Sequence, residues 1–294
     1  MKNKGYLLVM TTAVISGFSI FLNKFGVAFS NPYIFAFLKN ILVALVLTSI
    51  LLAFKDYKIF KTLSKKQWGI LVAIGLVGGS VPFLLFFKGL SMTSAAGASF
   101  IQKTMFVWIF LLAGYFLKEK ISARYILAGF SLILGNLLLL KATDFRFDIG
   151  SGLVLLATLF WAAENVLSKH VLSELPAKIV MWSRMFFGSI FIFIFLVFNH
   201  QTSLLGTLKY DQVGWAIATS LLLFGYVYTW YSGIKYVKIS EAAIILMLGS
   251  PITTLLSTIF TRPAALNEYA AMLFIICGVL VAFGSKIKQQ YVRT

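Results

Sequence analysis

The chain has 294 residues, of which 60% are hydrophobic, and its mean hydropathy is +0.92. A soluble domain of this length could not bury so much apolar side chain, so the composition indicates an integral membrane protein. The net charge of +17 comes from Lys and Arg residues that flank long apolar runs, which favours a membrane origin over nucleic-acid binding.

The N-terminal half contains five apolar runs of about 20 residues, the length that one helix needs to cross a bilayer. The first run follows the basic start "MKNKG" and is longer than the core of a signal peptide, with no convincing cleavage site after it. We therefore predict a retained first span. The predicted spans of this half are 5–27, 33–54, 67–88, 95–117 and 121–140.

After the polar break "KATDFRFD", the second half contains five more runs, at 149–170, 178–199, 211–233, 240–261 and 266–285. Every run is too long for a barrel strand and lacks strict alternation, so helices are the elements that the pattern predicts. The expected fold class is an all-α polytopic membrane protein with ten transmembrane helices. Cys277, the single cysteine, is expected to be a small buried packing residue.

The distribution of the 26 Lys and Arg residues predicts the orientation. With ten spans both termini lie on one side, which then holds seventeen of them, against six on the other side and three within spans. Because basic loops stay in the cytoplasm, we predict a multi-pass protein of the cytoplasmic membrane with both termini cytoplasmic.

The sequence also contains a weak internal repeat. An offset of 145 residues superposes Lys24 on Lys169 and Lys39 on Arg184, and an offset of 144 superposes Gly89 on Gly233. Each unit has five spans, an odd number, so the second copy must insert upside down, as in many secondary transporters. The predicted organisation is two inverted five-helix repeats, residues 1–143 and 147–288, with a cytoplasmic tail at 289–294.

Four motifs carry a resemblance to a known family. They are "WAAENVLSKHVL" (161–172) at the start of a repeat, Arg184 in "MWSRMFF" on the next helix, "GYFLKEKIS" (114–122) at the end of the fourth helix, and "LGSPITTLLS" (248–257) in the corresponding helix of the second repeat. In this order and spacing they resemble the EamA-type members of the drug/metabolite transporter superfamily, over essentially the whole chain.

The resemblance implies a secondary transporter of small organic metabolites, in which the third and fourth helices of each repeat rock while the fifth and tenth form a scaffold or dimer contact. Family members often export amino acids and related metabolites. This chain departs from the pattern twice: the first repeat has "QKTMF" where the proline is expected, and the second ends in "TRPAALNEY" without the glutamate.

Lys103 lies about nine residues into its predicted span, close to the midplane and too deep to extend comfortably to the interface. Its neighbours Gln102 and Thr104 indicate a polar environment. Lys103 could be the counter-charge for a solute carboxylate or phosphate, or it could carry the coupling proton, since intramembrane ionisable groups are usually functional. The structural alternative is a lysine paired with an acid on another helix.

Glu164 is the acidic residue placed well inside a span, and Arg184 is expected at similar depth. An ion pair between the two is one interpretation. The other places Glu164 at the cavity as a proton site or cation ligand, with Asn165 pointing about 100° away from it. Lys39 occupies the position equivalent to Arg184, and we expect both basic residues to be structural or gating residues.

Aromatic residues cluster in "LLLFGYVYTWYSG" (221–233), which an interfacial belt explains. Tyr226 and Trp230 are nevertheless spaced i, i+4 on one face and could line the mouth of a substrate site. Trp108 and Trp161 lie at depths close to the buried charged residues, so we include them in the predicted cavity wall.

Glycine and proline mark the expected gating segments, where helices approach closely or bend. "GLVGGSVP" (75–82) contains Pro82, and "GSP" contains Gly249 and Pro251 in the second repeat.

No metal cluster, phosphate-binding loop or catalytic triad is legible, so we expect no cofactor, no metal and no enzymatic activity. The predicted function is export of an amino-acid-like or other carboxylate-bearing solute by alternating access, with a nucleotide-sugar or phosphorylated-metabolite exchanger as the alternative. A lipid flippase or a polytopic membrane enzyme is the alternative hypothesis from a different functional class. The expected partners are a small-molecule substrate and the lipid bilayer, with no nucleic acid, and the default state is a monomer with a homodimer as the alternative.

Overall fold

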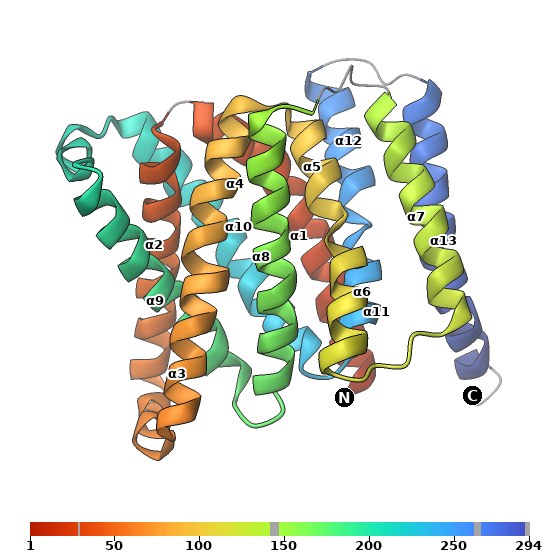
Figure 1. The fold of residues 1–294 in the computed structure, drawn as a ribbon, viewed down its shortest axis with the longest axis horizontal. Coiled ribbons are helices and arrows are strands. Elements are labelled where there is room, and N and C mark those ends of the chain that lie inside the picture. Colours follow the sequence, from red (N-terminus) through yellow and green to blue (C-terminus); the bar gives the residue numbers. More distant parts are fainter. Residues whose placement is uncertain (29, 142–146, 262–265, 292–294) are drawn as a thin grey trace.

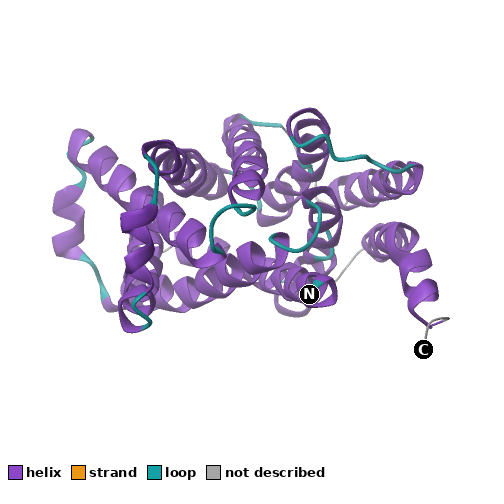
Figure 2. Cartoon of the chain, turned by 90° about the horizontal axis from the view of Figure 1, so that it is seen from below, coloured by secondary structure: helices purple, strands orange, loops and turns teal. Residues whose placement is uncertain are grey.

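The computed structural model describes residues 1–28, 30–141, 147–261 and 266–291, and within these ranges the regular elements are all helices (Figures 1 and 2). The first half of the chain forms α1 (Lys2–Ala28), α2 (Pro32–Ala53), η1 (Asp56–Thr62), α3 (Lys65–Ile74), η2 (Gly75–Ser80), α4 (Val81–Met92), α5 (Ala95–Lys103), α6 (Met105–Phe116) and α7 (Ala123–Lys141).

The second half forms α8 (Ile149–Val171), α9 (Ala177–Phe198), η3 (Thr202–Thr207), α10 (Tyr210–Ile234), α11 (Ile239–Leu246), α12 (Gly249–Phe260) and α13 (Leu266–Tyr291). In the described part of the chain, nine helical segments are long and apolar enough to cross a membrane, and Ala123–Leu138 adds a shorter apolar helix. The prediction of ten transmembrane helices is confirmed.

Local sequence explains where several helices begin. Asn31 precedes Pro32, the first residue of α2, and its side chain accepts from two backbone N–H groups, while Ser64 forms a capping box with Gln67 at the start of α3. Asp148 caps α8 by accepting from the Ser151 backbone N–H at 2.7 Å. This hydrogen bond to the carboxylate lowers the pKa of Asp148 from its ordinary value of 3.8.

The two repeats run in opposite directions through the bundle. The start of α1 and the end of α13 lie at the same end, which we call the terminal end, whereas α8 begins at the opposite end (Figure 1). Lys24 donates to the carbonyls of Leu90 (2.9 Å) and Thr93 (2.7 Å), and its counterpart Lys169 donates to those of Ile234 (2.6 Å) and Val237 (2.7 Å).

The partners of these two lysines are themselves separated by 144 residues. Each lysine satisfies the carbonyls that the end of the third membrane span of its own repeat leaves without helical donors. The repeat found in the sequence is therefore a repeat of structure, and the predicted inverted organisation is confirmed.

Glycines at equivalent positions of the two repeats allow helices of different repeats to pack closely at both ends of the bundle. A Cβ atom on Gly89 would lie 2.6 Å from the Gly150 carbonyl oxygen, and one on Gly233 would lie 3.1 Å from that of Gly5. Such approaches let α4 pack on α8 and α10 pack on α1 with their backbones nearly in contact.

The third span is interrupted. The predicted helix 67–88 is an α-helix up to Ile74, a π-helical turn over Gly75–Ser80 and an α-helix again to Met92. Pro82 has no N–H to donate to the carbonyl of Gly78, four residues before it, so that carbonyl is free for other donors. The interruption falls within "GLVGGSVP", the segment predicted to allow close helix contact or a bend.

The fourth and ninth spans are each split into two helices. The first breaks at Thr104, between α5 and α6, and the second breaks at Met247 and Leu248, between α11 and α12. Lys103 is the last residue of α5, so the break falls at the charged residue that the sequence singles out.

Acidic side chains join the repeats at the terminal end. Glu119, in the motif after α6, accepts from the Ile239 N–H (3.0 Å) and from the Ser240 N–H (3.2 Å) and hydroxyl (2.6 Å), and so caps α11. Glu241 of α11 is 3% exposed and accepts from Tyr125 at 2.6 Å and from Tyr6.

Helices α7 and α13 pack against each other at one edge of the bundle (Figure 1). Cys277, on α13, is exposed, so its prediction as a buried packing residue is wrong. The reason is physical: lipid tails are as apolar as a protein core, so an apolar residue in a span need not face the protein interior.

Candidate functional site

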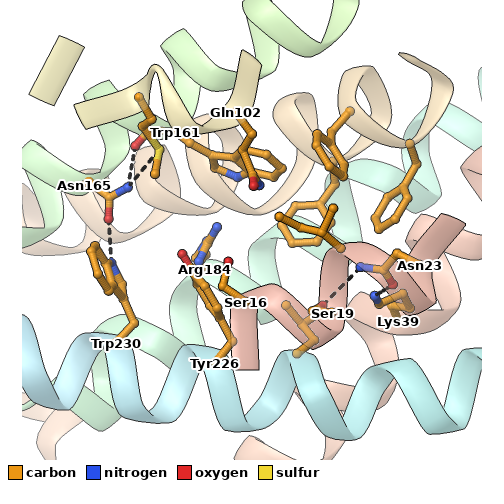
Figure 3. Close-up of a pocket in the computed structure, with 16 residues that line it drawn as sticks. Ser16, Ser19, Asn23, Lys39, Gln102, Trp161, Asn165, Arg184, Tyr226 and Trp230 are labelled. Carbon is orange, nitrogen blue, oxygen red and sulfur yellow. Dashed lines mark hydrogen bonds between the residues drawn. The ribbon is translucent and has the colours of Figure 1, made fainter. Parts of the chain in front are cut away.

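A cavity of about 70 Å³ is lined by side chains from both repeats, several of them polar (Figure 3). Helices α1, α2, α4, α8, α9 and α10 and the α5–α6 break contribute side chains. The lining residues are Ser16, Ser19, Ile20, Asn23, Lys39, Phe83, Phe86, Phe87, Gln102, Met105, Trp161, Asn165, Arg184, Leu223, Tyr226 and Trp230. No acidic side chain is among these residues of the described structure.

Most of the residues predicted for the site line this cavity. Gln102, Trp161, Asn165, Tyr226 and Trp230 do so, from three separate helices, α5, α8 and α10. The two basic residues that the sequence assigned to structure or gating lie in the same wall, and they are its only cations among the residues described.

Arg184 is 5% exposed and lies near the centre of the cavity in the view of Figure 3. Its Nε donates to the Gly78 carbonyl at 3.2 Å, the group that Pro82 leaves free. Its guanidinium carbon lies 5.6 Å from the Phe83 ring centroid and 5.7 Å from that of Tyr231. Cation–π contact lowers the cost of burying this charge, and the planar guanidinium suits a carboxylate or phosphate.

Lys39 is 1% exposed and lies beside Asn23 at one end of the cavity (Figure 3). Its ammonium donates to the Asn23 side-chain oxygen and lies 5.2 Å and 5.1 Å from the ring centroids of Phe35 and Phe87. Asn23 also donates to Ser19 at 3.1 Å, which fixes the orientation of its amide. The Asn23 amide and the two phenylalanine rings thus contact the Lys39 ammonium, and no acidic side chain of the described structure forms an ion pair with it.

At the other end, Asn165 orders two tryptophans (Figure 3). Its side-chain oxygen accepts from Trp230 Nε1 at 2.6 Å, and its amide nitrogen donates to the Trp161 carbonyl at 2.8 Å. Trp161 Nε1 in turn donates to Gly78 at 3.0 Å. Tyr226 stacks on Trp230 with ring centroids 6.1 Å apart, so one wall of the cavity is a rigid aromatic surface.

Glu164 is fully buried but does not line the cavity. Its Oε1 accepts from Tyr231 and Ser168, each at 2.5 Å, while its Oε2 has no hydrogen-bond partner among the described residues. Within that part of the chain it forms no ion pair with Arg184, since Lys178–Asp56 is the pair found. The ion-pair interpretation therefore does not hold in this conformation.

Lys103 and Trp108 also lie outside the lining. Lys103 is 3% exposed, and its ammonium donates to Ser16, a lining residue, at 3.0 Å and to the Leu246 carbonyl at 3.4 Å. That carbonyl belongs to the last residue of α11, where the helix break removes its usual donor. Trp108 is partly buried and packs against the hydrophobic core.

The three residues predicted for gating lie at the helix interruptions. Pro82 follows the π-helical turn, and Gly249 and Pro251 begin α12. A Cβ atom on Gly249 would lie 3.0 Å from the Lys103 ammonium nitrogen, so glycine is what lets this lysine reach the break.

Sequence reasoning missed the part of the cavity wall that α1 and α4 supply. Ser16, Ser19 and Asn23 lie on α1, and their spacing of three and four residues puts them on one helical face. A polar stripe in an apolar span was the available signal. The rings of Phe83, Phe86 and Phe87 carried no such signal, because phenylalanine is common throughout the chain.

Comparisons with known proteins agree with this architecture. The sequence profile described as "EamA-like transporter family" matches residues 3–141 and 148–284. An uncharacterized transporter, YyaM of Bacillus subtilis, is 23% identical over 95% of this chain and 93% of its own length. The riboflavin transporter ImpX of Fusobacterium nucleatum is 26% identical over 81% and 83%. A solved structure titled "Crystal structure of protein" superposes with a TM-score of 0.79 at 16% identity, over 96% of this chain and 97% of that one.

Proposed function

Because the chain belongs to the EamA-like transporter family, we propose that it is a secondary transporter of a small carboxylate-bearing organic solute. The observation that carries this proposal is the pair of buried cations, Lys39 and Arg184, in a cavity whose described lining has no acid. Two buried positive charges are costly unless an anion compensates them, and a solute carboxylate supplies that anion.

The aromatic wall narrows the class of solute. Trp161, Tyr226 and Trp230 line the cavity together with Phe83 and Phe86, and such aromatic surfaces favour a planar or aromatic group. An amino-acid-like solute with an aromatic side chain combines both features and is our first choice. Its carboxylate would bind near Arg184, whose Nε donates to the Gly78 carbonyl of the protein backbone.

The size of the cavity supports alternating access. Its volume of about 70 Å³ is smaller than the roughly 300–1,000 Å³ of typical small-molecule sites, so the helices must part before a solute enters. The π-helical turn and the two broken spans are the segments that can bend. In this proposal Lys103 acts through Ser16 and the Leu246 carbonyl, and not by direct contact with the solute.

Glu164 is the group that we propose carries the coupling proton, with Lys103 as the second candidate. The Oε2 atom of Glu164 is buried without a partner in the described structure, and a buried carboxyl group is less costly when a proton neutralises it. Tyr231 contacts both Glu164 and Arg184, so it joins the proton site to the cavity.

The excess of Lys and Arg at the terminal end supports an orientation with both termini in the cytoplasm, in the cell membrane. We propose export as the direction of transport and a monomer as the functional unit. The paired helices α7 and α13 would form the scaffold, or the contact surface of a homodimer. The chain would use no cofactor and have no enzymatic activity.

A second candidate is transport of a flavin or another nucleotide-like solute. A relative that covers most of the chain is named as a riboflavin transporter, and the aromatic wall suits a fused ring. The same two cations would serve the phosphate of a nucleotide sugar or phosphorylated metabolite in an exchanger.

A thermal-shift screen in detergent tests both candidates, with L-tyrosine, L-phenylalanine, riboflavin and UDP-glucose as probes. We expect an aromatic amino acid to raise the melting temperature of the wild type and of the surface control Lys66→Gln, but not of Arg184→Gln. Equal stabilisation of Arg184→Gln would overturn the assignment of the anion site. Stabilisation by riboflavin alone would establish the second candidate in place of the first.

Lys103→Ala separates the two roles considered for this lysine. If it acts through Ser16 and Leu246, transport of the solute falls less than in Arg184→Gln and the melting temperature falls with it. Complete loss of transport with an unchanged melting temperature would instead assign the ammonium to direct solute binding. Uptake into proteoliposomes and thermal unfolding in detergent measure the two quantities.

A further inference from the structure

A second, apolar cavity lies apart from the central one. It has a volume of about 390 Å³ and lies between α6 and α8, near the terminal end. The end of α6 contributes Phe116, and Leu117 follows it, while the last turns of α8 contribute Ala163, Val166 and His170. Its size falls within the range of small-molecule sites.

The internal repeat provides a comparison for this cavity, because α1 and α12 form the equivalent seam at the opposite end. At an offset of 145, Ala163, Val166 and His170 correspond to Phe18, Phe21 and Phe25. At an offset of 144, Phe116 corresponds to Phe260.

Phenylalanine rings fill the seam between α1 and α12. The Phe21 ring lies 5.0 Å from that of Phe25 and 6.0 Å from that of Phe260, measured between centroids. A Cβ atom on Gly17 would lie 2.6 Å from Ile252, so these two helices are in close contact. The seam between α6 and α8 has Phe116 in the place of Phe260, but it has Val166 and His170 in the places of Phe21 and Phe25, and these smaller side chains leave room for a ligand.

The position of the cavity identifies its ligand. Both helices belong to membrane spans, and Phe116 (65% exposed) and the exposed Ala163 open the seam towards the bilayer. The lining is apolar except for His170, so the ligand is an apolar chain that bears a polar group at the terminal end. In a bilayer, that description fits the acyl chain of a phospholipid.

The basic residues at the same end indicate which lipid headgroup the site would bind. His170 is exposed at the end of α8 and can donate a hydrogen bond to a phosphate oxygen in either protonation state. Lys118 follows the lining residue Leu117 in the chain, and most of the basic residues of the protein lie at this end. We propose that the seam between α6 and α8 binds an anionic phospholipid, with one acyl chain in the cavity and the phosphate at His170.

Such a lipid would contact both repeats at a seam that alternating access must rearrange. Helix α6 begins with Met105 and α8 carries Trp161, and both residues line the central cavity. A ligand that fits the seam in this conformation stabilises this conformation over others. The lipid site would thus regulate transport without contacting the solute.

Native mass spectrometry of delipidated protein tests this proposal, with palmitoyl-oleoyl phosphatidylglycerol and the matching phosphatidylcholine as probes. Ala163→Phe and His170→Phe place phenylalanine where the equivalent helix α1 has Phe18 and Phe25, and both positions are exposed, so the fold should tolerate them. We expect the wild type to retain one phosphatidylglycerol in preference to phosphatidylcholine, and each variant to bind it at least about fivefold more weakly.

Leu156→Phe is the matched control, since Leu156 lies on the same helix, is 44% exposed and lies outside the cavity. The control should bind the lipid like the wild type. Equal binding by Ala163→Phe and Leu156→Phe would overturn the proposed site. Equal retention of the two lipids by the wild type would overturn the headgroup assignment. None of these outcomes depends on the identity of the transported solute.

Discussion

Two pairs of basic residues occupy equivalent positions in the two repeats, and they have diverged to different degrees. Lys24 and Lys169 make the same bonds to equivalent carbonyls. Lys39 and Arg184 share only a ring at one equivalent position, Phe87 in the first repeat and Tyr231 in the second. Backbone carbonyls are the same whatever the sequence, so a residue that satisfies them has no reason to change.

The residues that surround the cavity cations differ between the two repeats. Lys39 donates to the amide of Asn23, whereas Arg184 donates to the backbone of Gly78. The polar residues around them differ as well, because Ser16 and Ile20 correspond to Trp161 and Asn165. A solute is not symmetric, so the two walls that face it need different chemistry. Under the proposed function, the symmetric pair maintains the fold, while the pair that differs would recognise the solute.

The strongest test of this comparison is to remove each cavity cation. We expect Arg184→Gln to lower the initial rate of L-tyrosine counterflow in proteoliposomes about 10–100-fold, the cost of losing one charge-assisted hydrogen bond. Lys39→Gln should have a smaller effect, because the Lys39 ammonium already donates one hydrogen bond to Asn23. A larger effect for Lys39→Gln would reverse the roles that we give to the two repeats.

Gly78→Ala probes the wall of the second repeat from the opposite side. A Cβ atom there would lie 2.2 Å from Cγ of Glu164, so we expect the substitution to displace that side chain and cost about 2 kcal/mol or more of stability. Gly69→Ala is the control on the same span, since a Cβ atom there would meet no atom within 4 Å. Chemical denaturation in detergent measures both, and equal values would contradict the close packing of η2 on α8.

Lys24→Met and Lys169→Met test the symmetric pair. Each substitution leaves two carbonyls without a donor, and we expect each to cost about 1–2 kcal/mol, because the bonds lost are the same. Thermal unfolding of the two variants should give nearly equal shifts. If one variant were much less stable than the other, the structural equivalence of the repeats would not extend to their energetics.

The smallest effect concerns the cap of α8. Hydrogen bonding in the folded state lowers the pKa of Asp148, so its contribution to stability is present above 3.8, its ordinary value, and is lost as the pH falls through the folded-state pKa. We expect Asp148→Asn to lower the melting temperature slightly at neutral pH and to converge on the wild type in acid. A difference that stays constant with pH would assign the effect to packing.

Several features of the fold could be predicted because they depend on the free energy of transferring each segment from water to hydrocarbon, which follows from the composition of that segment. The ten spans follow from the cost of placing polar groups in hydrocarbon, and the inverted repeat follows from an odd number of spans per copy. The polar residues Gln102, Asn165, Lys39 and Arg184 could be located by depth alone. Depth is a property of position in a span, and counting residues gives it.

Which way a side chain faces could not be obtained in the same way. Lys103 was predicted to face the cavity, but it is not among the lining residues, and its ammonium donates to Ser16 and to the Leu246 carbonyl. Cys277 was expected inside and is exposed. In a soluble protein, apolar periodicity identifies the buried face, but a membrane span is apolar on every face and lipid accepts all of them.

The sequence alone therefore determined that the chain has ten membrane-spanning helices, that its halves are inverted copies, and which charged residues stand within the spans. Only the tertiary structure decided that the Gly78 carbonyl, which Pro82 leaves free, accepts from Arg184 and Trp161. It also decided that the Lys103 ammonium donates to the Leu246 carbonyl at the break between α11 and α12. The first set depends on transfer from water to hydrocarbon, which each segment undergoes separately. The second depends on which backbone groups a neighbouring helix leaves without partners, and that is fixed only when the helices pack.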